Sequence, residues 1–133
     1  MVTESWEAAY EKIRRRFVCA VGGWVEDVAR DLDAIEAAPE TCGGLECLFR
    51  KLHDLAGSSG TYGLPVVSTL ASDAVLVSRR ALERDAVLTT AEIQRVRELL
   101  QAIRSEMQAN PETSRRDGST GGGDDDTNGG LGT

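Results

Sequence analysis

Apolar residues recur every three or four positions through most of residues 1–109 of this 133-residue chain. This spacing places side chains on one face of an α-helix, whereas a β-strand requires a period of two. No segment shows a sustained alternation of apolar and polar residues, and the periodic segments contain almost no proline. With a hydrophobic content of 41% and few aromatic residues, the pattern predicts an all-α protein with an aliphatic core.

The periodicity and the positions of glycine and proline divide residues 1–109 into five predicted helices. The first two run from about residue 3 to 21 and from about 24 to 37, with a kink or short break at Gly22-Gly23 between them. The third begins near Thr41, a candidate N-cap, and ends near residue 61. The fourth opens at Pro65, and the fifth follows residue 89.

Two of these helix boundaries carry specific local signals. Gly63 suits the position just after a helix, where glycine adopts a left-handed backbone conformation without a steric penalty, and Pro65 suits the first turn of the next helix. Thr89 and Glu92 have the spacing of a capping box, in which each side chain bonds the other residue's backbone N–H. We therefore expect a tight turn before residue 65 and a well-defined helix start near residue 90.

Composition separates a foldable part from a tail. Residues 110–133 hold half of the chain's 14 glycines, and Leu131 is their only aliphatic side chain larger than alanine. Such a segment buries too little apolar surface to offset its ordering entropy. We predict one helical domain at residues 1–109 and a disordered Gly/Asp-rich tail at 110–133.

Net charge and hydropathy limit the classes of partner that the chain is expected to bind. The formal net charge of -7 argues against binding nucleic acid through bulk charge. No apolar run approaches the ~20 residues that span a bilayer, and the first residues lack the basic and apolar segments of a signal peptide. We expect no membrane association and a cytoplasmic location.

A metal site is not expected. We expect the three cysteines to be reduced thiols in the cytoplasm. If Cys42, Cys47 and His53 lay on one helix, Cys47 would point about 120° or more away from the other two, and His53 would lie about 16 Å along the axis from Cys42. Their side chains would not converge on one ion.

The only histidine, His53, lies beside an apolar helical stripe and not on it. The stripe is made of Leu45, Leu48, Phe49, Leu52, Leu55 and Ala56. At 100° per residue His53 falls at the edge of this stripe and faces outward, next to Gly57 and Gly60. Each glycine costs about 1 kcal/mol in a helix interior relative to alanine. We interpret the pair as clearance that lets another protein's active site reach the imidazole.

These residues resemble a known family. The spacing of His53, Leu55, Gly57, Ser58 and Gly63, with Leu64-Pro65 opening the next helix, is similar to the motif of the histidine-containing phosphotransfer (HPt) domains of multistep phosphorelays. In that motif Leu55, Gly63 and Pro65 are structural positions. The helix order extends the resemblance over roughly residues 3–109.

The resemblance implies a fold and a function. The fold is an antiparallel four-helix bundle with an additional N-terminal helix. The function is a phosphoryl carrier without kinase activity, in which His53 accepts a phosphoryl group from a receiver-domain aspartate and passes it to another receiver. The implied partners are the receiver domains of response regulators and hybrid histidine kinases, with Mg²⁺ on the partner receiver, no intrinsic cofactor, and the carrier acting as a monomer.

The chain departs from the family at Ala56, where many members carry a lysine that attracts the phosphoryl group. Arg50 is the nearest basic substitute by sequence, although a solvated role is equally expected for it, and Arg79 on the fourth helix is expected to face solvent. Ser58 either bonds a preceding helix carbonyl, the favoured role, or contacts the phosphoryl group. The alternative function is a helical adaptor that binds signalling partners without phosphoryl transfer.

Overall fold

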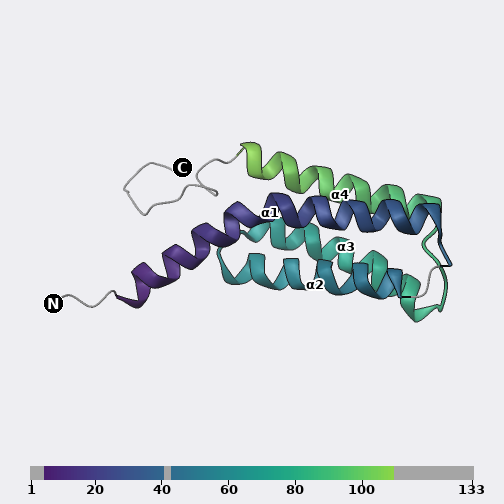
Figure 1. Ribbon diagram of the computed structural model, residues 1–133, viewed down its shortest axis with the longest axis horizontal. Helices are drawn as coiled ribbons and strands as arrows, with labels where there is room; N and C mark the ends of the chain where they lie inside the picture. Colours follow the sequence, from purple (N-terminus) through teal and green to yellow (C-terminus); the bar gives the residue numbers. More distant parts are fainter. Residues whose placement is uncertain (1–4, 41–42, 110–133) are drawn as a thin grey trace. The chain divides into compact units, whose positions relative to one another are not determined.

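The computed structural model describes residues 5–40 and 43–109, which form four α-helices and no strand (Figure 1). The helices are α1 (Trp6–Ala37), α2 (Gly44–Thr61), α3 (Pro65–Glu83) and α4 (Thr90–Ala109). Within this part of the chain, no helix combines the length and apolarity required to cross a membrane. Thr41, Cys42 and the tail at 110–133 lie outside the described residues, so the cap at Thr41 and the disorder of the tail stay predictions.

Helix α1 runs without interruption through Gly22-Gly23, so a break at this pair, and with it a separate first helix, is wrong, whereas a kink there stays a prediction. Val21 and Val25 flank the pair and are 0% and 1% exposed. Burying each valine contributes about 1.5–3 kcal/mol, whereas each exposed glycine costs about 1 kcal/mol in a helix. Burial on both sides therefore outweighs the poor helix propensity of the glycines.

Contacts divide the described residues into two units, 5–19 and 20–109. In the first unit the predicted apolar stripe is not buried along its length, because Trp6 is 73% and Ile13 46% exposed. Arg14 is buried in this unit and lies 3.8 Å from the carboxylate of Glu11. The apolar residues that recur along α1 thus form a continuous buried face only in the later part of this helix.

Residues 20–109 contain the main core, which is aliphatic as predicted. Its fully buried large side chains come from all four helices and the α2–α3 turn: Val21, Val25, Val28, Leu32, Leu48, Leu52, Leu55, Leu64, Val67, Val96, Leu100 and Ile103. Burial of this set supplies the main driving force for packing the helices together.

Ion pairs at the rim of this core show how the helices are oriented. Arg97 on α4 contacts Asp33 of α1 at 2.6 Å and also Glu36, and Arg104 contacts Glu26 of α1 at 3.1 Å. Residue numbers therefore rise along α4 as they fall along α1, and the two segments are antiparallel.

Helix α2 is tied to α1 by Lys51, whose Nζ lies 2.8 Å from Asp31 and 2.9 Å from Asp27. The hydrogen bond to Asp31, followed by that to Asp27, raises the pKa of the Lys51 ammonium above its usual value. The hydrogen bond from Lys51 also lowers the pKa of Asp27. Both ends of this contact stay charged across the physiological range.

The turn between α2 and α3 forms as predicted. Gly63 adopts a left-handed conformation at φ 76°, and the N–H of Leu64 donates to the carbonyl of Ser59 at 2.8 Å. Together with the 3.5 Å contact from the Gly63 N–H to the Gly60 carbonyl, this is the Schellman arrangement that satisfies the last carbonyls of a helix. Pro65 is the first residue of α3, so the two helices are joined by residues 62–64 alone.

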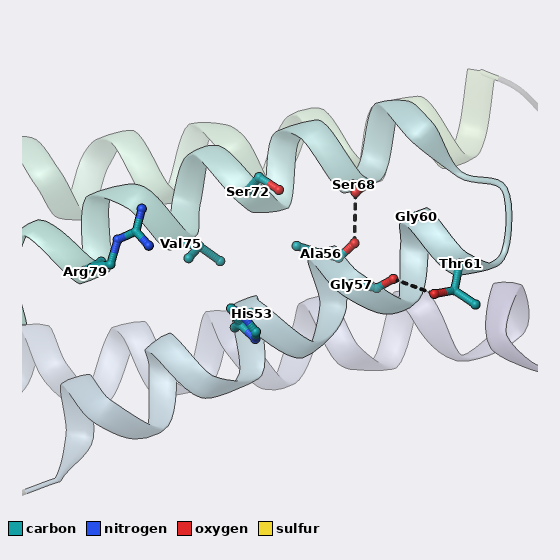
Figure 2. Close-up of a pocket in the computed structure, with 9 residues that line it drawn as sticks. All are labelled: His53, Ala56, Gly57, Gly60, Thr61, Ser68, Ser72, Val75 and Arg79. Carbon is teal, nitrogen blue, oxygen red and sulfur yellow. Dashed lines mark hydrogen bonds between the residues drawn. The ribbon is translucent and has the colours of Figure 1, made fainter.

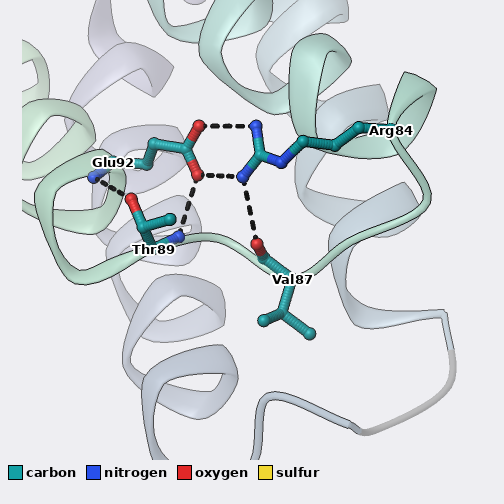
Figure 3. A network of polar contacts seen from close by, with 4 residues as sticks. All are labelled: Arg84, Val87, Thr89 and Glu92. Carbon is teal, nitrogen blue, oxygen red and sulfur yellow. Dashed lines mark hydrogen bonds and ion pairs between the residues drawn. The ribbon is translucent and has the colours of Figure 1, made fainter.

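The α3–α4 loop is closed by a polar network (Figure 3). Thr89 Oγ1 accepts from the Glu92 N–H at 3.1 Å while Glu92 Oε1 accepts from the Thr89 N–H at 2.8 Å, which confirms the capping box. The Arg84 guanidinium donates to both Glu92 oxygens, at 2.6 and 2.8 Å, and to the Val87 carbonyl at 3.2 Å. The Arg84 hydrogen bonds lower the pKa of Glu92 to about 2.

Candidate functional site

His53 lies on the exposed face of α2, as its wheel position predicts. Leu48, Leu52 and Leu55 are 0% exposed and form the centre of the buried stripe of α2, with half-buried residues on either side. Burial of this apolar face fixes the rotation of α2 about its own axis, and the imidazole therefore faces solvent. The side chain is therefore accessible to a partner without any rearrangement of the core.

A groove of about 650 Å³ runs beside His53 between α2 and α3 (Figure 2). Its walls are His53, Ala56, Gly57, Gly60 and Thr61 from α2 and Ser68, Ser72, Val75 and Arg79 from α3. Small residues dominate the α2 wall, so the backbone of that helix lines the groove closely. The groove combines one nucleophile, one cation and two hydroxyl-bearing serines.

The two glycines of this wall differ in what surrounds them. A Cβ at Gly57 would meet no atom within 4 Å, so no contact inside the described chain requires glycine there. A Cβ at Gly60 would lie 3.4 Å from Ser68 Oγ, a tight contact. Gly60 thus lies close to α3, whereas the space around Gly57 is open, as the clearance hypothesis requires.

Two hydroxyls in the groove bond helix carbonyls. Ser68 Oγ donates to the Ala56 carbonyl at 2.9 Å and connects α3 to α2 one turn beyond His53. Thr61 Oγ1 donates to the Gly57 carbonyl at 3.0 Å within α2. The half-buried Ser58, for which such a bond is the favoured prediction, makes no side-chain hydrogen bond to any residue in 5–40 or 43–109. A hydroxyl-to-carbonyl bond of this kind is thus made by Thr61 and not by Ser58.

The structure places a different arginine at the groove from the one that the sequence suggests. Arg79 is exposed, as predicted, and it also lines the groove with His53, whereas the exposed Arg50 is not among the lining residues. Arg79 forms no ion pair with any described residue, so its charge is available to an anion in the groove. The spacing of Ser68, Ser72, Val75 and Arg79 places them on one α3 face, but local spacing does not reveal that this face meets α2.

The described residues 5–40 and 43–109 contain no cluster of three His, Cys, Asp or Glu side chains that is placed to hold a metal ion. Cys19 is an exposed free thiol and Cys47 a half-buried one, while Cys42 lies outside the described residues. The groove itself offers one imidazole and one guanidinium, a set suited to an anion rather than a cation.

The comparison with known families agrees with this geometry. The family model described as Hpt domain matches residues 21–108, which include all of α2, α3 and the groove. Neither the curated proteins nor the solved structures give a match to the chain. Hpt domains take part in histidine phosphotransfer in phosphorelays and interact with the receiver domains of response regulators. The chain belongs to the Hpt domain family.

Proposed function

We propose that this protein is a phosphoryl carrier of a multistep phosphorelay, in which His53 accepts the phosphoryl group of a receiver-domain aspartate and passes it to another receiver. The observation that carries the proposal is the position of the only histidine, exposed at an open groove on helix α2 of an Hpt domain. The donor is a receiver domain of a hybrid histidine kinase, and the acceptor is a receiver domain of a response regulator.

The chemistry requires only one reacting group from this chain. A neutral imidazole keeps an unprotonated nitrogen with a lone pair near neutral pH. In the forward step this nitrogen forms an N–P bond as the bond between phosphorus and the aspartyl oxygen breaks, and the carboxylate leaves with the electron pair. In the second step a carboxylate of the next receiver takes the phosphoryl group and the imidazole leaves.

Phosphoryl transfer depends chiefly on positioning and on stabilising the charge of the transferred group. The receiver supplies a Mg²⁺ ion and the reacting carboxylate, while the carrier supplies access and orientation. Gly57 leaves the approach to His53 open because its α-carbon carries no side chain and no neighbour fills the space.

Arg79 takes the stabilising role, which by sequence is one of two equally expected roles for Arg50. The Arg79 side chain lines the same groove as His53, has no carboxylate partner among the described residues, and carries several donors that can bond phosphoryl oxygens. The Arg50 side chain is exposed on the same helix as His53 but outside the groove lining. Arg79 thereby compensates for the missing basic residue at Ala56.

The arrangement of the helices supports the fold expected of such a carrier. The antiparallel orientation of α1 and α4 and the short turn between α2 and α3 support an antiparallel four-helix bundle within residues 20–109. The carrier acts as a cytoplasmic monomer, and it needs no cofactor of its own because the Mg²⁺ is bound by the receiver.

The test is phosphoryl transfer from phosphorylated receivers of the source cell to the purified full-length chain. Acid-labile, base-stable label on His53, absent from the His53→Gln variant, is the expected result. A folded protein that no receiver labels would contradict the proposal. If His53→Gln also supported full signalling in cells, the chain would be an adaptor that binds partners without phosphoryl transfer.

A further inference from the structure

The imidazole of His53 stacks on the phenyl ring of Phe49, one turn earlier on α2. The two ring centroids lie 5.9 Å apart and the ring planes are inclined by 30°. Side chains on a helix lean toward its N-terminus, so a residue meets the one four positions before it. The contact therefore follows directly from the spacing of the two aromatic residues.

No polar contact with the described residues holds the imidazole in this orientation. Neither nitrogen of His53 has a hydrogen bond or ion pair with a residue in the described ranges 5–40 and 43–109. Exposed side chains without such partners change rotamer within picoseconds to nanoseconds. The Phe49 ring is itself half-buried along the edge of the core, so it is held more firmly than the exposed imidazole that rests on it.

In the conformer that stacks on Phe49, His53 also lines the groove between α2 and α3. Figure 2 shows the imidazole at the α2 wall of this groove. Val75 and Arg79 form the wall across from the imidazole. A docked receiver presents its aspartyl phosphate at one place, and transfer requires the nucleophile to be within about 3–3.5 Å of the phosphorus and in line with the breaking bond. Only the fraction of molecules with a correctly oriented imidazole is ready to react.

We propose that Phe49 is a positioning residue, which holds His53 in the conformer that faces the groove and so raises the rate of transfer with receivers. The inference rests on the proposed phosphotransfer function. Phe49 acts through the imidazole, in place of the hydrogen bond that commonly orients a reacting histidine. Stacked aromatic pairs shift an equilibrium by about twofold to tenfold beyond simple burial.

The test compares Phe49→Leu with Phe49→Tyr in the full-length chain, with Leu45→Ala as the matched control. Leu45 is half-buried on the same face of α2, one turn before Phe49, so its truncation perturbs packing without touching the imidazole. Three quantities are measured: the NMR shifts of the His53 ring protons, the rate of transfer from a phosphorylated receiver, and the rate of labelling by phosphoramidate, whose phosphoryl group moves to the imidazole as ammonia leaves.

In Phe49→Leu the His53 ring protons move downfield because the ring current of Phe49 is lost. Receiver transfer slows by about twofold to tenfold. Labelling by phosphoramidate stays unchanged, since a small donor reaches the exposed ring in any orientation. Phe49→Tyr restores both the shifts and the rate, and Leu45→Ala changes neither.

Unchanged His53 shifts in Phe49→Leu would overturn the proposal, as would shifts that move while receiver transfer keeps its wild-type rate. Equal slowing with phosphoramidate and with receivers would also overturn it, since the effect would then lie in the reactivity of the imidazole. If the wild-type protein accepts no phosphoryl group from any receiver, the proposed function fails instead, and the NMR shifts still decide whether Phe49 orients the ring.

Discussion

Arg79 on α3 and His53 on α2 line opposite walls of one groove, although they belong to different helices. In the proposed function, Arg79 stabilises a phosphoryl group on the imidazole. Arg79→Ala is expected to shorten the lifetime of phosphohistidine and to slow transfer by about threefold to tenfold, since the proposed charge-assisted contact of this exposed side chain would be lost. Arg50→Ala, measured alongside it by loss of radiolabel with time, should stay close to wild type. A larger effect at Arg50 would return the stabilising role to that residue.

Substitutions at Gly57 should affect stability and phosphoryl transfer in different ways. Its Cβ would meet nothing within 4 Å, so Gly57→Ala should raise the free energy of unfolding by about 1 kcal/mol through helix propensity. Gly57→Leu should also fold, but its side chain would obstruct the approach to His53 and slow receiver transfer at least tenfold. Thermal unfolding and transfer kinetics on the same samples check both statements. Full transfer activity in a folded Gly57→Leu protein would eliminate the clearance hypothesis.

Gly22 and Gly23 lie inside a continuous helix with open space around both α-carbons. Replacing either with alanine is expected to increase the free energy of unfolding by about 1 kcal/mol and to leave phosphotransfer unchanged. Urea denaturation, with helicity followed by circular dichroism, provides the measurement. Destabilisation by both substitutions would indicate that the chain needs a bend at this pair, as the sequence alone suggests.

Glu92 links stability to acid pH. Hydrogen bonding to Arg84 lowers its pKa to about 2 in the folded protein, below that of an unfolded glutamate near 4.3. Its contribution is complete above the unfolded pKa and is lost as the pH falls from about 5 toward 2. Because Arg84 is 40% exposed, the contribution is about 1 kcal/mol. Glu92→Gln should therefore be destabilised at pH 7 relative to wild type, with a smaller difference at pH 3.

The control for this prediction is Glu98→Gln. Glu98 is 57% exposed and its contact with Arg95 is long, at 4.0 Å. Urea denaturation of this variant at the same two pH values should show little difference from wild type. A pH-independent loss of stability in Glu92→Gln would mean that the network acts through packing and not through the carboxylate charge.

Local sequence signals predicted the features that depend on neighbouring residues. The turn at Gly63 and Pro65, and the capping box of Thr89 and Glu92, involve residues only a few positions apart, and both form as expected. The exposure of His53 followed from the apolar face of its own helix. In each case the relevant energy is present within one helix or turn.

Features that depend on packing between segments far apart in the sequence were not predicted from the sequence. Continuity of α1 through Gly22-Gly23 depends on the burial of Val21 and Val25 in a core built mostly by other helices. Arg79 is exposed, as the helical period predicts, but its place at the groove depends on which face of α3 meets α2. Helix propensity and periodicity describe one segment at a time, whereas both outcomes are properties of assembled helices.

The turn at residues 62–64 also affects how the groove is assembled. Both walls of the groove belong to α2 and α3, which this turn joins, and the Ser68 hydroxyl bonds the Ala56 carbonyl across the two helices. Closing so short a loop has a small entropic cost, and structures with local contacts form quickly. His53 and Arg79 are therefore brought to one groove by a single helical hairpin, so the proposed reactive centre depends on contacts between segments that are neighbours in the sequence.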